Sequence, residues 1–428
     1  MNVLIKGATL PDGRTADIRL ADGRIAQVGD SAHDAGARLV DARGLIALPA
    51  LVDLHTHLRE PGGEDAETVE SGTRAAAAGG FGCVHAMANT TPVQDTAGVV
   101  EQVLRLGELA GHADVRPVGA VSVGLRGEKL AELAAMARSA ARVRVFSDDG
   151  QCVHDPVLMR RALEYVKTFD AVVAQHAQEP RLTEGAQMHE GVVSAELGLT
   201  GWPAAAEESV IARDVLLAGH VGSRLHVCHV STRGSVEIIR WAKGRGIDVT
   251  AEVTPHHLLL DDTSARGYDP VFKVNPPLRS ADDVAAVREA LADGTIDIVA
   301  TDHAPHPPEA KDCEWAVAAF GMTGLETALP IVNELMVATG RMSWAEVARA
   351  MSTRPAGIGR VEDHGRPIAP GEPANLTLFD PAARWTVDPA ALATASPNTP
   401  VAGREMLGRT VATFLRGRQT HGKEEARG

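Results

Sequence analysis

Two histidines separated by one residue, His55 and His57, follow directly on the apolar run LIALPALVDL. Residues two apart in a β-strand point to the same side, so both imidazoles would emerge together where a buried strand ends. One strand can in this way offer two nitrogen ligands to a single divalent metal ion. Such a pair is also typical of an ordinary surface position, so the metal hypothesis depends on what the other strand ends supply.

Between residues 49 and 365, apolar segments typical of buried parallel strands alternate with Ala-rich segments typical of helices. The eight strand segments are LVDL, GCVHAM, VRPVGAV, RVRVF, AVVAQH, RLHVCHV, IDVTAEV and TIDIVATDH. No Gly-rich dinucleotide turn follows the first of them, which favours a (β/α)8 barrel over a doubly wound sheet. We therefore expect an α/β fold whose barrel spans residues 49–365.

The two ends of the chain carry a different pattern. Residues 1–48 alternate short β-like runs with two Asp-Gly turns, which indicates an antiparallel sheet built from hairpins. Beyond the punctuation PGEP, the runs ANLTLFD and TVATFLRG return to a β pattern. We expect residues 366–428 to complete the N-terminal sheet, so that both ends of the chain form one small domain.

Composition limits the functional classes. The chain has 428 residues, 44% of them hydrophobic, and a formal net charge of −14 with both signs interspersed, which argues against a nucleic-acid surface. The sequence contains no apolar run of membrane-spanning length and no secretory signal pattern, so we expect no membrane association and a cytoplasmic location. The four cysteines form no CxxC pair, which argues against a disulfide framework or a thiolate zinc site.

Barrel enzymes place their chemistry at the C-terminal ends of the strands. Imidazole and carboxylate side chains stand at five of the eight predicted strand ends: His55, His57, Asp148, Asp149, His176, His226, His229, Asp302, His303 and His306. This mixture of nitrogen and oxygen ligands suits zinc or a similar first-row ion better than calcium or magnesium, which prefer oxygen alone. The sequence therefore predicts a transition-metal site at this end of the barrel.

Several of these residues also have an ordinary structural interpretation. His226 lies three positions before His229 and so on the other side of the strand, which leaves only His229 facing inward. Asp148 and Asp149 precede a glycine and either one could cap a helix or a turn, and Asp302 could cap a loop. Three further histidines, at positions that the ligand set does not require, are expected to pack or to support ligands: His85, His256 and His257.

The segments HTHLREPG, SGTRAAAAGGFG, NTTP, FSDDG, HVST, TPHHL, NPPLR, ATDHAPH and GLET occur in this order. Over almost its whole length the sequence thereby resembles the bacterial class I dihydroorotases of the amidohydrolase superfamily. The resemblance implies a distorted (β/α)8 barrel with a small β-sandwich formed by both termini. It also implies zinc-dependent, reversible hydrolysis of L-dihydroorotate to N-carbamoyl-L-aspartate, a step of pyrimidine (UMP) biosynthesis.

Position by position, the resemblance implies metal ligation by His55, His57, His176, His229 and Asp302. Many relatives bridge two metals with a carboxylated lysine at the fourth strand, but VRVFSDDG contains no lysine. A carboxylate must take that place, and its spacing to His176 favours Asp149 over Asp148. The number of zinc ions, one or two, stays open. Asp302 would also carry a proton from the attacking water to the leaving ring nitrogen.

The resemblance assigns the substrate carboxylate to Arg59, Asn89 and His306, and it places Asn275 beside the ring. Arg59 shares the strand side of the histidine pair and can form two parallel charge-assisted bonds with a carboxylate. Its ordinary alternative is a rim ion pair with a neighbouring glutamate. HAQE stands where relatives commonly have HCED, and an alanine precedes Asn89 where they commonly have proline. Neither change removes a proposed ligand.

Two other functions are compatible with parts of this pattern. A hydantoinase-like or allantoinase-like amidase would share the metal site and recognise another ring, but Arg59, Asn89 and the absent lysine oppose it. A non-catalytic scaffold for aspartate carbamoyltransferase is opposed by the complete ligand set. A small-molecule substrate is expected, and a homodimer or an association with that transcarbamoylase is compatible with the resemblance. Residues 307–320 could form a lid over the pocket or a plain surface insertion.

Overall fold

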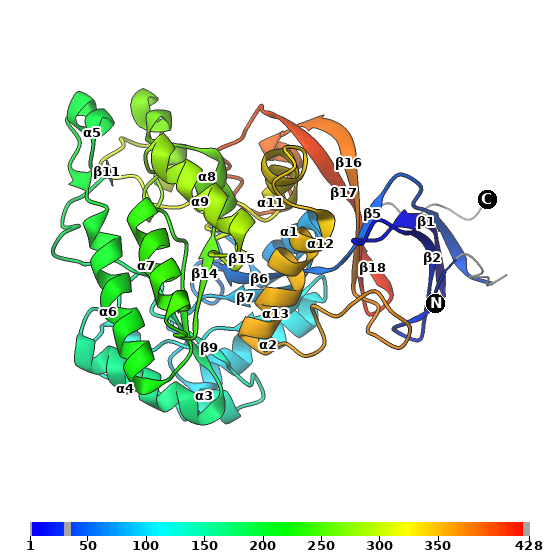
Figure 1. The fold of residues 1–428 in the computed structure, drawn as a ribbon, viewed down its shortest axis with the longest axis horizontal. Helices are drawn as coiled ribbons and strands as arrows, with labels where there is room; N and C mark the ends of the chain where they lie inside the picture. Colours follow the sequence, from blue (N-terminus) through cyan, green and yellow to red (C-terminus); the bar gives the residue numbers. More distant parts are fainter. Residues whose placement is uncertain (1, 30–35, 423–428) are drawn as a thin grey trace.

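The computed structural model describes residues 2–29 and 36–422. Figure 1 shows two parts: a group of parallel strands covered by helices, and a twisted sheet at one side in which both ends of the chain meet. We call these parts the strand ring and the terminal sheet. The ring carries the strand ends at which the sequence predicts a metal site.

All eight strands predicted for the central region are present. They are β6 (Leu51–Thr56), β7 (Phe81–Ala86), β8 (Asp114–Pro117), β9 (Val145–Phe146), β10 (Val172–Gln175), β13 (Leu225–Val227), β14 (Val249–Val253) and β15 (Ile298–Val299). The strands pair in parallel in two groups, β6 to β8 and β9 to β15. Parallel bridges from Gly119 to Phe146 and from Thr56 to His303 join the groups at both seams. The C-terminal strand ends therefore face one another around a common axis.

Helices follow the strands and cover the ring. They are α1 (Val69–Gly79), α2 (Ala97–Ala110), α3 (Leu133–Arg138), α4 (Pro156–Val166), α5 (Val192–Leu197), α6 (Ala205–Val221), α7 (Arg233–Gly244), α8 (Pro255–Leu259), α9 (Ala281–Asp293), α10 (Pro308–Lys311), α11 (Ala328–Val332), α12 (Trp344–Ala348) and α13 (Arg354–Gly359). Side-chain caps start several of them, for example Thr68 at α1, Asp155 at α4 and Ser280 at α9. A π-helical turn, Arg349–Thr353, links α12 to α13, where Pro355 cannot donate a backbone hydrogen bond.

The terminal sheet joins strands from both ends of the chain in the order β18-β17-β16-β5-β1-β2-β3, with β4 beside β1. Its members are β1 (Val3–Thr9), β2 (Thr15–Ala21), β3 (Arg24–Val28), β4 (Arg38–Asp41), β5 (Ile46–Pro49), β16 (Leu376–Thr386), β17 (Glu405–Leu415) and β18 (Arg418–His421). The predicted hairpins β1-β2 and β2-β3 are antiparallel. The expectation of a purely antiparallel sheet is wrong, because β4 and β5 return to run parallel to β1.

One part of the C-terminal region lies against the ring instead of the sheet. The backbone N–H of Ala393 donates to Glu326 over 2.8 Å, and the hydroxyl of Thr394 donates to Glu67. Asn398 accepts from the backbone N–H of His306 over 3.0 Å. The domain division 1–48, 49–365 and 366–428 stays a prediction, with the qualification that residues 393–398 contact the ring.

A short parallel pair, β11 (Met188–His189) and β12 (Gly201–Trp202), stands apart from both sheets. It frames α5 in the connection between β10 and α6. Across the described ranges 2–29 and 36–422, none of the helices combines the length and the apolar character that a membrane crossing requires.

Candidate metal centre and active site

The predicted histidine pair stands at the end of β6 with both rings buried. His55 Nε2 lies 3.3 Å from Oδ1 of Asp149, and His57 Nε2 lies 3.3 Å from Oδ2 of the same carboxylate. The two nitrogens therefore face the end of β9 across the ring. One strand does present both imidazoles to one point, as the two-residue spacing predicts.

The histidines that follow β10 and β13 meet the same carboxylate. His176 Nδ1 lies 3.2 Å and His229 Nε2 lies 3.3 Å from Asp149 Oδ1. The two imidazole nitrogens are 2.9 Å from each other. Asp149 is thus surrounded by four imidazole rings that come from three strand ends.

Asp302, which follows β15, closes the group. Its Oδ1 lies 3.0 Å from His57 Nε2 and 3.4 Å from His55 Nε2. The structure therefore brings together all six side chains for which the sequence predicts metal ligation: His55, His57, Asp149, His176, His229 and Asp302. Their assignment as metal ligands stays a prediction. The arrangement specifies which nitrogen and oxygen atoms would face the ion.

The two adjacent aspartates after β9 have different surroundings. Asp148 Oδ1 accepts from the backbone N–H groups of Val121 and Ser122 over 2.8 and 2.9 Å, and its Oδ2 accepts from the Ser122 hydroxyl. Asp149 faces the imidazoles. Successive residues of an extended chain point to opposite sides, which explains the division. Asp148 ties β9 to the loop after β8, and Asp149 is the carboxylate available to a metal.

Three of the four rings have the nitrogen that faces away from the centre held by an acceptor. His55 Nδ1 donates to Glu252 over 2.6 Å, His57 Nδ1 to Asn89 Oδ1 over 2.9 Å, and His176 Nε2 to Gln178 Oε1 over 2.8 Å. A ring that donates through one nitrogen presents a lone pair at the other. These contacts fix the orientation of the three rings, so that each inward nitrogen presents a lone pair to a metal once it carries no proton.

The inward nitrogens and Asp149 fit a bound cation. His55 Nε2 is buried and has no hydrogen-bond partner among the described residues, and the facing nitrogens of His176 and His229 are close enough to share either a proton or a cation. Imidazole nitrogens with one or two carboxylates are the usual ligands of zinc in catalytic sites. The residues present therefore fit a first-row divalent ion.

Electrostatics leads to the same conclusion. Burial favours the neutral carboxyl, yet the surrounding imidazoles hold the pKa of Asp149 well below its usual range, and His55 and His57 lower the pKa of Asp302. Burial likewise favours a neutral ring, yet the carboxylates of Asp149, Glu252 and Asp302 raise the pKa of His55 well above its ordinary value. The centre holds its carboxylates ionised and attracts positive charge.

Glu252 on β14 was not among the predicted site residues. One oxygen accepts from His55 Nδ1 and the other lies 3.0 Å from Nε2 of His226, whose Nδ1 contacts Thr250 over 2.8 Å. His226 thus lies on the inner side of β13, not on the opposite side as the three-residue spacing predicted, and it connects to the centre through Glu252. The alternation of Thr250 and Glu252 in IDVTAEV was the available signal, because the two share one side of the strand.

Three site residues adopt a left-handed backbone. Arg59 has a φ of 61°, His229 of 32° and Asp302 of 46°. Non-glycine residues rarely adopt positive φ, and such strain is held in place by the surrounding structure, often at active sites. Each of the three follows a strand end, where a sharp turn of the chain aims the side chain inward.

The predicted carboxylate-binding group is partly assembled. Arg59 is half-buried; its Nε donates to the carbonyl of Pro305 over 3.0 Å, and its Nη2 lies 3.3 Å from Nε2 of His306. His306 Nε2 donates to the carbonyl of Phe320 over 2.8 Å. Burial, and secondly the charge of Arg59, lowers the pKa of His306 to about 3, so the ring is neutral. Arg59 is therefore not paired with a neighbouring glutamate.

The two predicted amide residues lie on opposite sides of the centre. Asn89 fixes His57, as described above. Asn275 donates through Nδ2 to Gln178 Oε1 over 3.0 Å, while its buried Oδ1 has no hydrogen-bond partner within the described chain. Gln178 belongs to the HAQE sequence and holds both His176 and Asn275. An unpartnered amide oxygen beside the metal ligands is free to accept from a ring N–H.

The remaining histidines have structural contacts. His85 Nδ1 donates to the carbonyl of Asp53 over 2.9 Å, and His257 bridges Thr254 and the carbonyl of Pro276. His256 packs at a tilt against His257 with ring centroids 4.6 Å apart, and burial lowers the pKa of both rings. These contacts agree with the expected packing and supporting roles.

A separate group of Asp114, Asp363 and His364 could also be read as a metal site. Arg416 forms two 2.7 Å bonds with Asp114, and Arg116 pairs with Asp363 over 3.0 Å. The arginines already neutralise both carboxylates. This group is an ion-pair network between β8 and the terminal sheet.

Residues 307–320 are packed against the ring. Lys311 donates to the carbonyls of Pro270, Lys273 and Ala319 over 3.0, 3.0 and 2.7 Å, and burial lowers its pKa to about 7. Lys273 donates in return to the carbonyl of Trp315 over 2.6 Å. Two buried lysines thus hold this connection beside His306 in the present conformation. Its movement as a lid stays a prediction.

Comparison with known proteins identifies the family. A family model described as Dihydro-orotase-like matches residues 44–235. A curated protein named Dihydroorotase from Streptomyces coelicolor is 69% identical over 97% of both chains, and one of the same name from Mycobacterium tuberculosis is 56% identical over 98% of both chains. The chain belongs to the dihydroorotase family. The predicted resemblance is therefore confirmed, and dihydroorotases are hydrolases that cleave a cyclic amide.

Solved structures with a similar fold include an L-hydantoinase (dihydropyrimidinase) from Arthrobacter aurescens. It has a TM-score of 0.86 and 26% identity, with 99% of this chain and 96% of that chain covered. A dihydropyrimidinase from Brevibacillus agri has a TM-score of 0.85 and 22% identity, with 98% and 95% covered. The chain shares its α/β fold with these amidases, while its sequence is far closer to those of the dihydroorotases.

Proposed function

We propose that this chain is a metal-dependent dihydroorotase that interconverts L-dihydroorotate and N-carbamoyl-L-aspartate with the residues around Asp149. The observation that carries the proposal is the convergence of four imidazoles and two carboxylates at one end of the strand ring, in a chain that is 69% identical to a dihydroorotase. We propose that zinc is the metal and that one or two ions are held, with Asp149 as the ligand that would be shared between two.

The metal would be held by the imidazoles and by Asp149 and Asp302. When bound, a divalent ion lowers the pKa of water toward 7 and acts as a Lewis acid toward a carbonyl. Asn89, Gln178 and Glu252 keep the ligand rings in the orientation that binding requires. The chain therefore supplies a preorganised site, and little rearrangement is needed when the ion enters.

Asp302 is the proposed proton carrier. It is the second carboxylate of the centre, and Oδ1 is within 3.4 Å of two ligand rings. Its ionised form can accept the proton of the attacking water and donate it to the ring nitrogen that leaves. In the reverse direction the same carboxylate returns the proton and is left unchanged overall. Ring closure converts one carboxylate of N-carbamoyl-L-aspartate into a neutral amide carbonyl with loss of water, so it consumes one proton and is favoured in mildly acid solution.

Substrate recognition is proposed at Arg59, Asn89, Asn275 and His306. Arg59 offers the guanidinium atoms that Pro305 does not engage to a planar carboxylate. The free Oδ1 of Asn275 would accept from the ureide N–H. Arg59 is half-buried, so its attraction to a substrate carboxylate is stronger than that of an arginine in open water.

Three broader expectations accompany this function. We propose that the ring and the terminal sheet correspond to the distorted (β/α)8 barrel and the β-sandwich of the superfamily. We also propose a cytoplasmic location within pyrimidine biosynthesis, and assembly as a homodimer or with aspartate carbamoyltransferase. Size measurement of the purified chain, alone and mixed with that transcarbamoylase, tests the assembly.

The function is tested with the purified chain loaded with zinc. We expect it to hydrolyse L-dihydroorotate, to cyclise N-carbamoyl-L-aspartate near pH 6, and to lose both activities when a chelator removes the metal. Hydantoin and allantoin serve as competing substrates. Turnover of either compound without turnover of dihydroorotate would replace the proposal with the other cyclic-amidase function.

A further inference from the structure

A cavity of about 540 Å³ lies at the end of the strand ring opposite the metal centre. Residues 141–144 line it and directly precede β9, while Phe169 and Asp170 line it and precede β10. Asp149 and His176 follow the same two strands. The cavity is therefore a separate site, and its volume lies within the range of about 300–1,000 Å³ that is common for small-molecule sites. We call it the arginine cavity.

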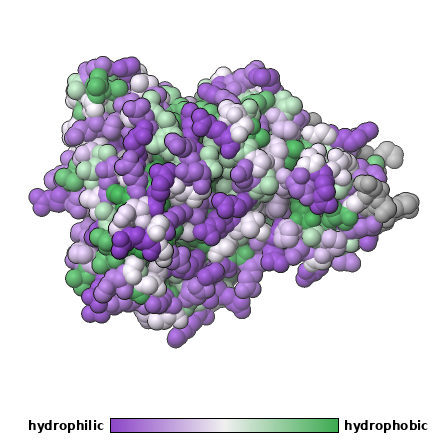
Figure 2. Space-filling view, viewed as in Figure 1, coloured by the Kyte–Doolittle hydropathy of each residue, from purple (hydrophilic) through white to green (hydrophobic). Residues whose placement is uncertain are grey.

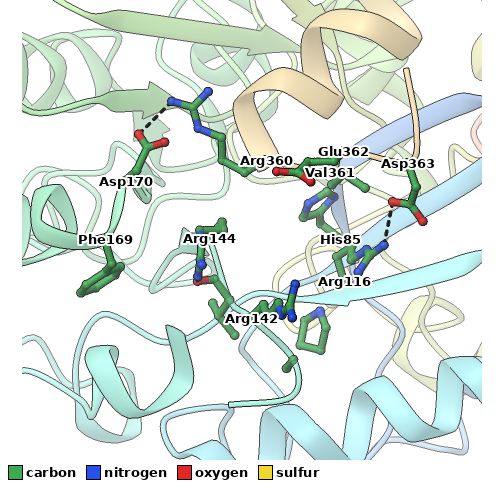
Figure 3. A pocket seen from close by; sticks show the side chains of 14 residues that line it. His85, Arg116, Arg142, Arg144, Phe169, Asp170, Arg360, Val361, Glu362 and Asp363 are labelled. Carbon is green, nitrogen blue, oxygen red and sulfur yellow. Dashed lines mark hydrogen bonds and ion pairs between the residues drawn. The ribbon is translucent and has the colours of Figure 1, made fainter. Parts of the chain in front are cut away.

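Four arginines line the arginine cavity, and two of them are in ion pairs. Arg360 pairs with Asp170 over 2.8 Å, and Arg116 pairs with Asp363 over 3.0 Å. Figure 3 shows Arg142 and Arg144 between these pairs. Within the described ranges, no carboxylate pairs directly with Arg142 or Arg144. Arg142 is exposed and Arg144 is half-buried, so the cavity keeps two guanidinium charges that no described carboxylate neutralises.

Two guanidinium groups of the cavity, those of Arg144 and Arg116, have N–H donors that bond to no group of the described chain. Arg144 is fixed by Nη1, which donates to the carbonyls of Ala137 and Val143, both over 2.9 Å. Its Nε and Nη2 form no bond with the described chain. Nε of Arg116 is buried and has no partner among the described residues. Fixed guanidinium groups with unused N–H donors match the tetrahedral oxygens of a phosphate group.

The rest of the lining suits an organic group. Phe169, Val143 and Pro117 provide apolar surface beside the arginines. His85 also lines the cavity; its Nδ1 donates to the carbonyl of Asp53, which leaves Nε2 as an acceptor for a hydroxyl group. Free phosphate would use only the positive charge of this site. The apolar surface and the neutral acceptor suit an organic group attached to the phosphate.

We infer that the arginine cavity binds a small phosphate monoester, with the phosphate between Arg142 and Arg144 and the organic part against Phe169 and His85. This inference does not depend on the dihydroorotase reaction. One lining group opposes it: Glu362 is exposed at the cavity and carries a negative charge. Removal of that charge should therefore strengthen phosphate binding, whereas removal of an arginine should weaken it.

The test is calorimetric titration of the zinc-loaded full chain with ribose 5-phosphate and with inorganic phosphate, at constant ionic strength. We expect ribose 5-phosphate to bind more tightly than inorganic phosphate. Arg142→Gln combined with Arg144→Gln should weaken binding by about tenfold or more, because bonds to charged groups contribute roughly 1.5–3 kcal/mol each. Glu362→Gln should strengthen it. Tighter binding of inorganic phosphate would instead make the free ion the ligand and overturn the monoester assignment.

Two further variants separate this site from others. Arg105→Gln changes an exposed arginine of α2 that does not line the cavity, and it should leave binding within twofold of the unchanged chain. Arg59→Gln changes the metal end and should also leave it intact. The inference is overturned if neither phosphate compound binds, if the Arg142→Gln and Arg144→Gln variant binds normally while still folded and active, or if Arg59→Gln alone abolishes binding.

Discussion

The two ends of the strand ring carry opposite chemistry on the same strands. β9 is preceded by Arg142 and Arg144 and followed by Asp149, and β10 is preceded by Asp170 and followed by His176. At the C-terminal end the imidazoles and carboxylates are buried and held by further hydrogen bonds. At the N-terminal end the arginines are more exposed and only two of them are paired. Substitutions at one end should therefore leave the ligand of the other end bound.

The metal centre and the arginine cavity differ in how firmly their side chains are held as well as in their charge. Each ligand ring at the metal centre is aimed by a left-handed backbone, by a neighbouring acceptor, or by both, as His229 and His55 illustrate. The arginine cavity has one such fixed group, Arg144. Reactions demand fixed geometry, whereas binding tolerates side chains that adjust. The metal centre should accordingly respond to far smaller changes than the cavity does.

The largest effect is expected at Asp302. Asp302→Asn keeps the shape and one ligand oxygen but cannot accept a proton, so turnover of dihydroorotate should fall by about 10²–10⁴-fold or more with only partial loss of zinc. Steady-state rates and zinc content of the same preparation measure both. Near-normal turnover would return Asp302 to the role of a loop cap.

The second largest effect, after that of Asp302, is expected at Glu252, which is not one of the proposed substrate-binding residues. Glu252→Gln keeps the shape and loses the charge that holds His55, and losses of about 10–100-fold in metal affinity or activity are typical of such contacts. Zinc titration of the apo chain measures it. Glu326→Gln is the matched control, because Glu326 is a largely buried carboxylate whose contacts are the backbone N–H groups of Ala393 and Thr394. Equal zinc affinity in both variants would remove Glu252 from the account.

A moderate effect is expected at Arg59. Arg59→Lys keeps the charge but cannot form two parallel bonds with a carboxylate, so the Michaelis constant for dihydroorotate should rise about tenfold or more, with a smaller change in kcat. Arg142→Lys, the corresponding change at the other end of the ring, should leave that constant unchanged. A shift in the second variant would mean that the two ends are coupled.

The smallest effect on catalysis is expected at Glu326, where stability should depend on pH. Burial raises the pKa of this carboxyl from 4.5 to about 7, so the folded chain binds more protons than the unfolded chain between these values. Stability from this group is therefore lost as pH rises from about 4.5 to 7, by roughly 1–3 kcal/mol. Glu326→Gln should flatten this slope in denaturant unfolding, and Glu289→Gln, an exposed carboxylate on α9, should not.

Sequence reasoning succeeded where the signal was local. The two-residue spacing of His55 and His57, and the position of Asp302 directly after an apolar run, are sufficient to place these side chains at strand ends. Eight strands in series then bring the ends together, so the meeting of the six predicted ligands followed from topology. The choice of Asp149 agrees with the structure in geometry, because Asp148 is engaged by Ser122.

Sequence reasoning failed where contacts join distant segments. Asn398 reaches His306 from a region predicted to belong to the terminal domain, and no local pattern reports such a contact. The parallel course of β4 depends on how the chain crosses β1, which the turn residues do not encode. The arginine cavity likewise combines residues of β7 and β8 with two connections and the segment at the end of α13, so its residues appear unrelated in the sequence.

The most direct test of the metal centre compares the zinc content of Asp149→Ala and Asp148→Ala, measured per folded chain. Asp149→Ala should stay folded and lose most of its zinc, because four imidazoles lose the carboxylate they share. Asp148→Ala should keep its zinc and lose stability, since each buried donor left unsatisfied at Val121 and Ser122 costs about 1–3 kcal/mol. Full zinc in Asp149→Ala, or loss of zinc confined to Asp148→Ala, would contradict the account.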